Sequence, residues 1–182
     1  METRTESLPT PSQTVGPYFG MALPWPDGPF VVDSESEGAF WIRGLVTDGH
    51  GEPIPDALIE TWQADQNGQF PDRPGTAFRG LGRCPTDRAG MYEIWTVMPG
   101  SVAGVDGSDQ APHINVTILM RGLLRPVVTR IYFPDHQGND SDPLLTSVPE
   151  ASRQTMVARR SDDGYRFDIR LQGDGETAFF VL

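Results

Sequence analysis

The residues best suited to chemistry in this sequence lie in the stretch Ala-Pro-His-Ile-Asn-Val at positions 111–116. On a β-strand, residues i and i+2 project from the same face, so a His-x-His pair here would direct two imidazoles at one metal ion. The sequence has His113 followed by Asn115 instead. The pattern therefore indicates a metal site that has lost a ligand, a site completed elsewhere in the chain, or a plain strand.

His113 differs from the other two histidines because it opens an apolar strand directly after a proline-containing loop. At such a place a side chain can be held rigidly while it faces a cavity. A histidine bonded to a backbone carbonyl is the structural alternative. His50 and His136 lie in polar or glycine-rich segments typical of exposed loops. The sequence contains no nucleophile elbow, phosphate loop or zincin helix, so motifs give no support to those reaction classes.

Composition predicts one domain over residues 1–182, long enough to bury a core. With 25 acidic and 14 basic side chains, the net charge of -11 argues against a nucleic-acid partner. Cys84 is the single cysteine, which excludes an intrachain disulfide and favours a reducing compartment. The first ten residues do not resemble a secretory signal, and no apolar run is long enough to span a bilayer. We expect a cytoplasmic protein without membrane segments.

Seventeen prolines and twenty glycines separate short β-rich runs, which predicts an all-β fold, an antiparallel β-sandwich with long loops. The sequence 165–171 alternates apolar and charged residues, as a strand with one buried face does. The expected strands are Phe40–Thr47, Ala57–Asp65, Met91–Val97, His113–Met120, Thr129–Phe133, Tyr165–Leu171 and Thr177–Leu182.

Three turns begin with aspartate and end with glycine three residues later, at Asp48, Asp65 and Asp87. The second superficially resembles a calcium loop, but its glycine comes too early and no glutamate closes it. We therefore expect hairpin turns and no calcium site.

One short helix is expected near residues 148–160, because Ser147 and Glu150 form a capping box around an early proline. Arg159 and Arg160 would then be its solvated end. The segment Pro134–Leu145 is expected to be a loop, as are two longer irregular stretches. These two are Pro71–Cys84 and Pro99–Pro112.

Four segments together resemble the protocatechuate 3,4-dioxygenase family of intradiol ring-cleaving enzymes, and the resemblance spans nearly the whole chain. The segments are TPSQTVGPY at 10–18, ALIETWQADQNGQF at 57–70, APHINV at 111–116 and YRFDIRLQGDGETAFF at 165–180. In that family the catalytic β chain holds one non-haem ferric ion with two tyrosinates and two histidines. The two histidines form a His-x-His pair on a strand.

The sequence departs from this ligand pattern at three of the four positions. Phe70 and Val102 stand where the resemblance places tyrosines, and Asn115 stands where it places the second histidine. Gln110 likewise stands where the catalytic chain carries an arginine. Phenylalanine and valine have no lone pair to donate, so we expect this chain to bind no iron. His-Ile-Asn in place of His-Ile-His resembles the family's α chain, which has lost its own metal centre.

The resemblance implies that the N-terminal arm, about residues 1–30, packs on an iron-bearing β subunit and forms one wall of its substrate pocket. Carried onto matching positions, the wall residues are Thr14, Gly16, Pro17 and Tyr18, and Arg121 would face the substrate carboxylate. Glycine and proline let the backbone approach a flat ring closely. The alternative is a loose proline-rich arm and a solvated arginine at a strand end.

The implied activity is O₂-dependent intradiol cleavage of 3,4-dihydroxybenzoate to 3-carboxy-cis,cis-muconate in a large assembly of αβ pairs, with Fe(III) on the partner. Arg130 is a second candidate anchor for an anion, although its position suits a structural ion pair equally. The competing hypothesis is a non-catalytic β-sandwich module that binds aromatic acids or holds an assembly together. An extracellular immunoglobulin-like domain is disfavoured, because Cys84 alone cannot form the inter-sheet disulfide.

Overall fold

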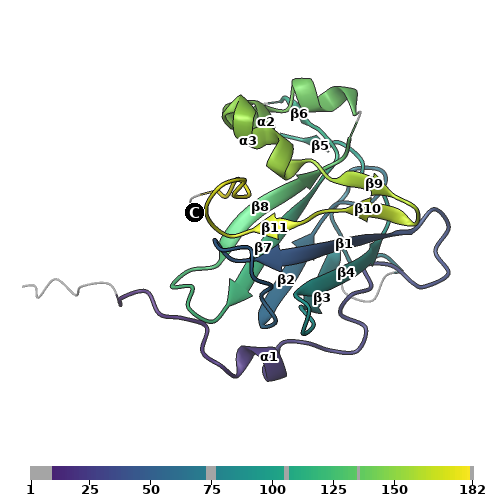
Figure 1. The fold of residues 1–182 in the computed structure, drawn as a ribbon. Coiled ribbons are helices and arrows are strands. Elements are labelled where there is room, and N and C mark those ends of the chain that lie inside the picture. Colours follow the sequence, from purple (N-terminus) through teal and green to yellow (C-terminus); the bar gives the residue numbers. More distant parts are fainter. Residues whose placement is uncertain (1–9, 73–76, 105–106, 135, 181–182) are drawn as a thin grey trace, which may run out of the picture.

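Two β-sheets pack face to face in the computed structural model, which describes residues 10–72, 77–104, 107–134 and 136–180 (Figure 1). The first sheet contains β1 (Phe40–Thr47), β4 (Met91–Thr96), β9 (Arg159–Ser161), β10 (Gly164–Arg166) and β11 (Ile169–Arg170). The second sheet has the order β3 (Leu81–Pro85), β2 (Ala57–Trp62), β7 (His113–Met120) and β8 (Val127–Tyr132). A small hairpin joins β5 (Val102–Ala103) and β6 (Asp109–Gln110). The expected all-β sandwich is confirmed.

Residues that alternate along the strands fill the space between the sheets. Ile42 of β1, Ile94 of β4 and Ile114 of β7 belong to one core cluster and are fully buried. The buried Tyr92 donates its hydroxyl hydrogen to the carbonyl oxygen of Phe167, at 2.7 Å. Because apolar faces drive this packing, β1 and β7 have the bounds that the sequence pattern predicted.

The first sheet is mixed, because β1 pairs antiparallel with β4 but parallel with β10 and β11. The expected single strand at 165–171 is interrupted between β10 and β11. At the interruption the side chain of Asp168 accepts a hydrogen bond from the Leu45 N–H, at 2.9 Å. The Asp168 carboxylate thus takes the place of a backbone carbonyl as the acceptor for this N–H. The alternation of apolar and charged residues continues across the break.

Short helical segments occupy the region between β8 and β9, at the top of Figure 1. They are η1 (Gln137–Asp140), α2 (Pro143–Ser147), α3 (Glu150–Arg153) and η2 (Gln154–Met156). The expected helix near 148–160 therefore covers only 150–156, and Arg159 and Arg160 begin a strand instead of ending a helix. The preceding segment, expected to be a loop, contains η1 and α2.

The capping box predicted at Ser147 does not form. Ser147 is the last residue of α2, and its hydroxyl donates to the Leu144 carbonyl oxygen, at 2.7 Å. Val148 and Pro149 have extended backbones, with ψ of 138° and 136°. A residue before proline is driven out of the helical region, so the chain breaks between the two helices.

Several other boundaries differ from expectation. The stretch Pro71–Cys84 contains most of β3, and Pro99–Pro112 contains the β5–β6 hairpin. β3 escapes pattern recognition because one of its two buried positions is Gly82, where Thr61 and Val31 already fill the space of a side chain. At the C-terminal end, 177–180 makes only a bridge between Phe180 and Val128 in place of the expected strand, and residues 181–182 lie outside the described residues. The expected strand Ala57–Asp65 ends at Trp62.

The three aspartate turns share one hydrogen-bond pattern. In each, Oδ1 accepts the backbone N–H groups two and four residues later; Asp87, for example, accepts from Ala89 and Met91, at 2.8 and 2.9 Å. Asp48 and Asp65 do the same. The carboxylates serve the turns themselves. Among the described helices, none has the length and apolar character needed to cross a membrane.

Candidate functional site

The candidate residues gather on the outer face of the second sheet. In β7, Ile114 and Val116 point into the core, so His113 and Asn115 point outward. Trp62 of β2 and Arg130 of β8 are the direct cross-strand neighbours of Asn115. Directly opposed residues share a face, so Trp62, Asn115 and Arg130 form one row across three strands.

The N-terminal arm covers one end of this outer face. Its helix α1 (Phe19–Ala22) lies at the bottom of Figure 1, on the opposite side of the molecule from α2 and α3. Phe19 is buried, and it lines a pocket of about 450 Å³ together with the fully buried Leu58. The pocket is lined by Pro17, Phe19, Gly20, Pro55, Asp56, Ala57, Leu58, Pro85, Thr86 and Arg121.

Two arginines, one in β3 and one in the connection between β7 and β8, hold the arm in place. Arg83 of β3 donates from Nη1 to the Leu23 carbonyl oxygen, at 2.9 Å, and its guanidinium lies 4.9 Å from the ring centre of Trp25. Arg125 donates from Nε to the Ser12 hydroxyl, at 3.2 Å. The arm therefore has fixed contacts with the chain's own sheet at several points along its length.

Two of the residues assigned to the pocket wall meet in the pocket. Pro17 and Arg121 both line it, and Arg121 follows β7 directly. The Nε of Arg121 forms an ion pair with the carboxylate of Asp56, and the arginine side chain is 71% exposed. Thr14 lies exposed on the arm before the pocket, and Gly16 has a left-handed φ of 76°.

Apolar side chains on and beside the arm face solvent. Tyr18 and Met21 are 73% and 74% exposed, and Val15 and Leu124 are also exposed. Large apolar side chains that gather on a surface mark interaction sites. The outer side of the arm therefore presents apolar side chains to solvent.

At the other end of the outer face, the guanidinium of Arg130 is held by neutral oxygen atoms. Its Nε donates to Asn115 Oδ1 at 3.0 Å, and its Nη1 donates to Gln110 Oε1 at 2.8 Å. Nη1 also lies 3.4 Å from the Tyr132 hydroxyl. Within the described ranges, no carboxylate forms an ion pair with Arg130.

The buried carboxylate of Asp142 binds Tyr132, one of the groups that contact Arg130. Asp142 is fully buried, accepts the Tyr132 hydroxyl hydrogen at 2.9 Å and accepts the Ala111 N–H at 2.9 Å. It also caps α2 by accepting the N–H groups of Leu144 and Leu145. Our sequence reading missed this residue, although aspartate followed by proline is a known helix start.

His113 is a satisfied histidine in the folded chain. It is 4% exposed, and its Nδ1–H donates to the Ala111 carbonyl oxygen at 2.7 Å. Burial, with a smaller effect of the nearby Arg130 charge, lowers the pKa of His113 to about 4. The imidazole is therefore neutral at pH 7, and its ring lies 5.9 Å from that of Tyr132.

The residues at the positions of the family's metal ligands do not fit a ferric ion. The Asn115 amide binds Arg130 through its oxygen and the Trp62 carbonyl through its nitrogen. Phe70 stacks on Trp62, with ring centres 5.7 Å apart, and offers no donor. In the described part of the chain, no three His, Cys, Asp or Glu side chains are grouped as metal ligands. A guanidinium cation also opposes a second cation at close range.

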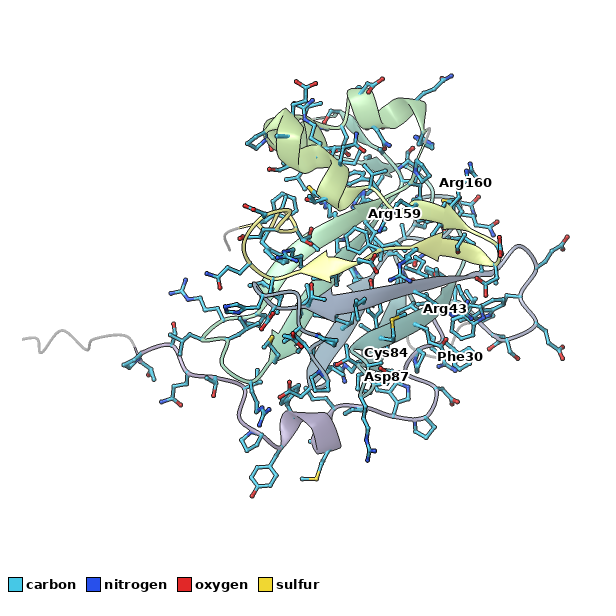
Figure 2. All side chains as sticks on the ribbon, viewed as in Figure 1. Phe30, Arg43, Cys84, Asp87, Arg159 and Arg160 are labelled. Atoms are coloured by element: carbon cyan, nitrogen blue, oxygen red, sulfur yellow. The ribbon has the colours of Figure 1, made fainter. Side chains whose placement is uncertain are left out.

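A second groove, of about 810 Å³, lies on the first sheet and is lined by several arginines. Arg159 and Arg166 both bind the Asp168 carboxylate, at 2.8 and 2.9 Å, and Arg43 pairs with Asp163. Figure 2 shows Arg43 and Arg159 beside β1 and β9 on this sheet. Asp168 offsets only part of the charge of the arginines that line the groove. The residues that the family resemblance assigns to substrate or metal lie elsewhere, so the outer face of the second sheet is the stronger candidate.

The fold and these residues place the chain in a known enzyme class. Residues 15–173 match the family model described as Dioxygenase, so the chain belongs to this dioxygenase family. The protocatechuate 3,4-dioxygenase alpha chains of Burkholderia cepacia and Pseudomonas putida are each 40% identical to it. The alignments cover 94% and 96% of this chain, and 96% and 98% of those chains.

More distant relatives agree with this placement. The beta chain of Burkholderia cepacia protocatechuate 3,4-dioxygenase is 33% identical over 75% of this chain and 65% of its own length. The dioxygenase domain of a Streptomyces carbohydrate-binding fusion protein superposes with a TM-score of 0.62 at 29% identity, covering 93% of this chain and 99% of that chain. Catechol 1,2-dioxygenase of Pseudomonas arvilla shares the fold, with a TM-score of 0.62 at 20% identity over 82% of this chain and 58% of that one.

Proposed function

We propose that this chain is the α subunit of a protocatechuate 3,4-dioxygenase. In this proposal it pairs with an iron-bearing β subunit, and the two chains together cleave 3,4-dihydroxybenzoate with O₂ to 3-carboxy-cis,cis-muconate. The 40% identity to two alpha chains over nearly full length supports the assignment. The Fe(III) on the β subunit supplies the redox chemistry, and this chain supplies binding groups.

The observation that carries the proposal is the shared pocket of Pro17 and Arg121. The substrate is an anion, and the chain's net charge of -11 would repel it without a local cation. Asp56 contacts Arg121 through Nε, which leaves the Nη groups to donate to a carboxylate. A charge-assisted bond of this kind contributes about 1.5–3 kcal/mol when partly buried.

The arm would contribute shape and exclude water. Gly16 and Pro17 have little side-chain bulk, so the backbone can approach a flat ring closely. Thr14 can donate or accept a hydrogen bond, and the exposed Tyr18 and Val15 supply apolar contact. Thr14, Gly16, Pro17, Tyr18 and Arg121 would thus bind and orient the substrate, while proton and electron transfer take place at the partner's iron.

Coexpression with a β subunit tests the proposal. The two-chain complex should show ferric-tyrosinate absorbance and oxygen uptake with 3,4-dihydroxybenzoate, and the lone chain should show neither. Arg121→Gln should raise KM about tenfold or more with little change in kcat, because the lost bond orients the substrate carboxylate. Arg88→Gln, an equal loss of charge on the exposed Asp87 turn and away from the arm, is the matched control.

Two results would contradict the proposal. Iron and activity in the lone chain would place the metal centre here. An unchanged KM in the Arg121→Gln complex would instead support a non-catalytic module that holds the assembly together. Measuring iron per chain and the mass of the complex on the same samples separates these outcomes from poor assembly.

A further inference from the structure

The groove of about 810 Å³ on the first sheet, called the arginine groove from here on, is lined by more cations than anions. Among the described residues that line it, Asp168 is the single acidic side chain, against four arginines. The four are Arg159, Arg160, Arg166 and Arg170. Because the whole chain has a net charge of -11, this cluster opposes the general charge of the protein. A local excess of cations of this kind attracts anions to the groove.

Two of these arginines mark separate ends of the groove. Arg166 of β10 is the register partner of Arg43 on β1. Arg170 of β11 is the register partner of Thr47, four residues further along β1. The segment between the two arginines has the same length, so it stays extended across the break between β10 and β11. Residues four apart on an extended segment share one face, and their backbones are about 13 Å apart.

At the first end, two arginines share one carboxylate. Arg159 Nη2 lies 2.8 Å from Oδ2 of Asp168. Arg166 binds both carboxylate oxygens, with Nε 3.0 Å from Oδ2 and Nη2 2.9 Å from Oδ1. The Arg159 side chain is 72% exposed. A guanidinium has five N–H donors, so this end keeps donors and one positive charge for a second anion.

At the second end, Arg170 has no acidic partner within the described ranges. Its Nη2 donates to the Gly49 carbonyl oxygen at 3.0 Å. Its Nε is buried and has no hydrogen-bond partner among the described residues. A buried donor without an acceptor costs free energy, so a ligand that brings an acceptor to this end is favoured.

The floor between the two ends is less polar. Leu45 lies on β1 between the register partners of Arg166 and Arg170, and it lines the groove together with Thr47. The Leu45 N–H donates to the Asp168 carboxylate, so a negative charge of the chain lies at the middle of the groove. A ligand with carbon at its middle and charges at its ends avoids this carboxylate.

We propose that the arginine groove binds an extended dicarboxylate. One carboxylate accepts hydrogen bonds from Arg159 and Arg166, the other accepts from Arg170, and the carbon chain lies over Leu45. A chain of about six carbons, with a hydrogen bond of about 2.8 Å at each end, has a length comparable to the distance between the two ends. The groove shares no lining residue with the pocket of Arg121, so this proposal goes beyond the proposed function and does not depend on it.

Calorimetric titration of the lone full chain with adipate, a six-carbon dicarboxylate, tests the proposal. We expect one adipate per chain. At the same ionic strength, succinate, acetate and inorganic phosphate should bind about tenfold more weakly or less, because each can contact only one end of the groove. Equal ionic strength in all titrations keeps the screening of exposed charges the same.

Variants locate the ligand in the groove. Arg170→Gln should weaken adipate binding about tenfold, because one charge-assisted contact is lost. Arg159→Gln should weaken it severalfold, since this side chain is more exposed. Arg88→Gln, an equal loss of charge on the exposed turn between β3 and β4, lies outside the groove lining and should leave the affinity unchanged.

Absence of saturable adipate binding by the wild-type chain overturns the proposal. Unchanged affinity in Arg170→Gln also overturns it, as does an equal loss in Arg88→Gln, which would point to the general charge of the chain. Phosphate, acetate or succinate binding as tightly as adipate overturns the ligand class. Circular dichroism verifies folding, and Arg159→Gln decides the matter if Arg170→Gln does not fold. No β subunit is present in these titrations, so their outcome is separate from that of the KM test.

Discussion

The Nε of Arg130 lies 3.0 Å from Oδ1 of Asn115, the residue that follows His113 by two positions on β7. A cation belonging to the chain therefore occupies the neighbourhood in which His-x-His would hold a metal. The Asn115 amide satisfies this cation and the Trp62 carbonyl together. The side chain that stands in place of the second histidine therefore binds a cation of the chain itself.

Restoring the histidine alone should not restore a metal site. Asn115→His removes the oxygen that accepts from Arg130 and places a second nitrogen heterocycle beside a guanidinium. We expect the free energy of unfolding to fall by about 1–2 kcal/mol, because a half-buried donor loses its partner. Denaturant unfolding measures this loss. Asn67→His, on the exposed Asp65 turn, is the control and should change little.

Metal analysis of the same variants completes this test. After dialysis against Fe(III) or Co(II), neither Asn115→His nor the wild type should retain metal, because Phe70 and Val102 still lack donor atoms. Retention of one metal per chain by Asn115→His with Arg130 intact would contradict our reading of the outer face.

The stability of the chain should rise with pH between about 4 and 6.5, in part because of His113. Its pKa is lowered to about 4 in the folded chain, below the ordinary value of 6.5, so the unfolded chain binds more protons in this window. Stability from this group is complete above pH 6.5 and is lost as the pH falls. Between pH 7 and pH 5 the loss should be about 2 kcal/mol.

Urea unfolding at both pH values measures the loss, and His113→Gln isolates the contribution of the imidazole. The variant should show a pH dependence smaller by about 2 kcal/mol than that of the wild type. His50→Gln is the control, since His50 lies in an exposed turn with its side chain 91% exposed. If His113→Gln kept the full wild-type pH dependence, other groups would be responsible for it.

Gly68 should be essential to the packing of the loop that carries Phe70. It has a φ of 76°, and a side chain there would overlap the Ser101 carbonyl oxygen. Gly38 has a similar φ of 70° with no atom near its missing side chain. Gly38→Ala therefore measures the cost of the left-handed backbone alone, about 1 kcal/mol, and Gly68→Ala should cost about 1–3 kcal/mol more. Equal melting temperatures for the two variants would show that the loop carrying Phe70 can shift to accommodate a side chain at position 68 without loss of stability.

Local patterns predicted the strands better than the segments between them. Alternation along β1 and β7 reflects burial on one face, which is a property of each strand alone. The helix near Ser147 was misplaced because two start signals compete there, and Asp142 with its following proline forms the cap. Asp142 wins because Ala111 and Tyr132 also donate to its carboxylate, contacts that no local pattern contains.

The candidate site shows the same division. The resemblance directed attention to Pro17 and Arg121, and the structure brings them into one pocket. The resemblance could not reveal that Asp56 pairs with Arg121, since the two residues come from separate segments of the sequence. In the sequence, Arg130 suits an anion anchor and a structural ion pair equally, and only the fold shows neutral partners around it. Packing of the arm on a partner stays a prediction.

Asp56 should weaken substrate binding in the two-chain complex. Its carboxylate lines the same pocket as Arg121 and is bound to the arginine Nε, so it competes with a substrate carboxylate for the guanidinium and repels it. Asp56→Asn keeps the size of the side chain and removes the charge. We expect KM to fall about two- to fivefold at low salt with kcat unchanged, a size typical of exposed ion pairs.

Two further measurements identify the competition as the cause. Raising the salt concentration should shrink the difference between Asp56→Asn and the wild type, because both groups are accessible to screening ions. In an Arg121→Gln background, Asp56→Asn should lower KM much less. The guanidinium for which Asp56 and the substrate compete is absent there, and only weak repulsion between the two carboxylates is left. An equal gain in both backgrounds would mean that Asp56 acts through the general charge of the chain. A higher KM in Asp56→Asn would mean that the ion pair positions Arg121, and that the guanidinium needs this carboxylate to reach the substrate.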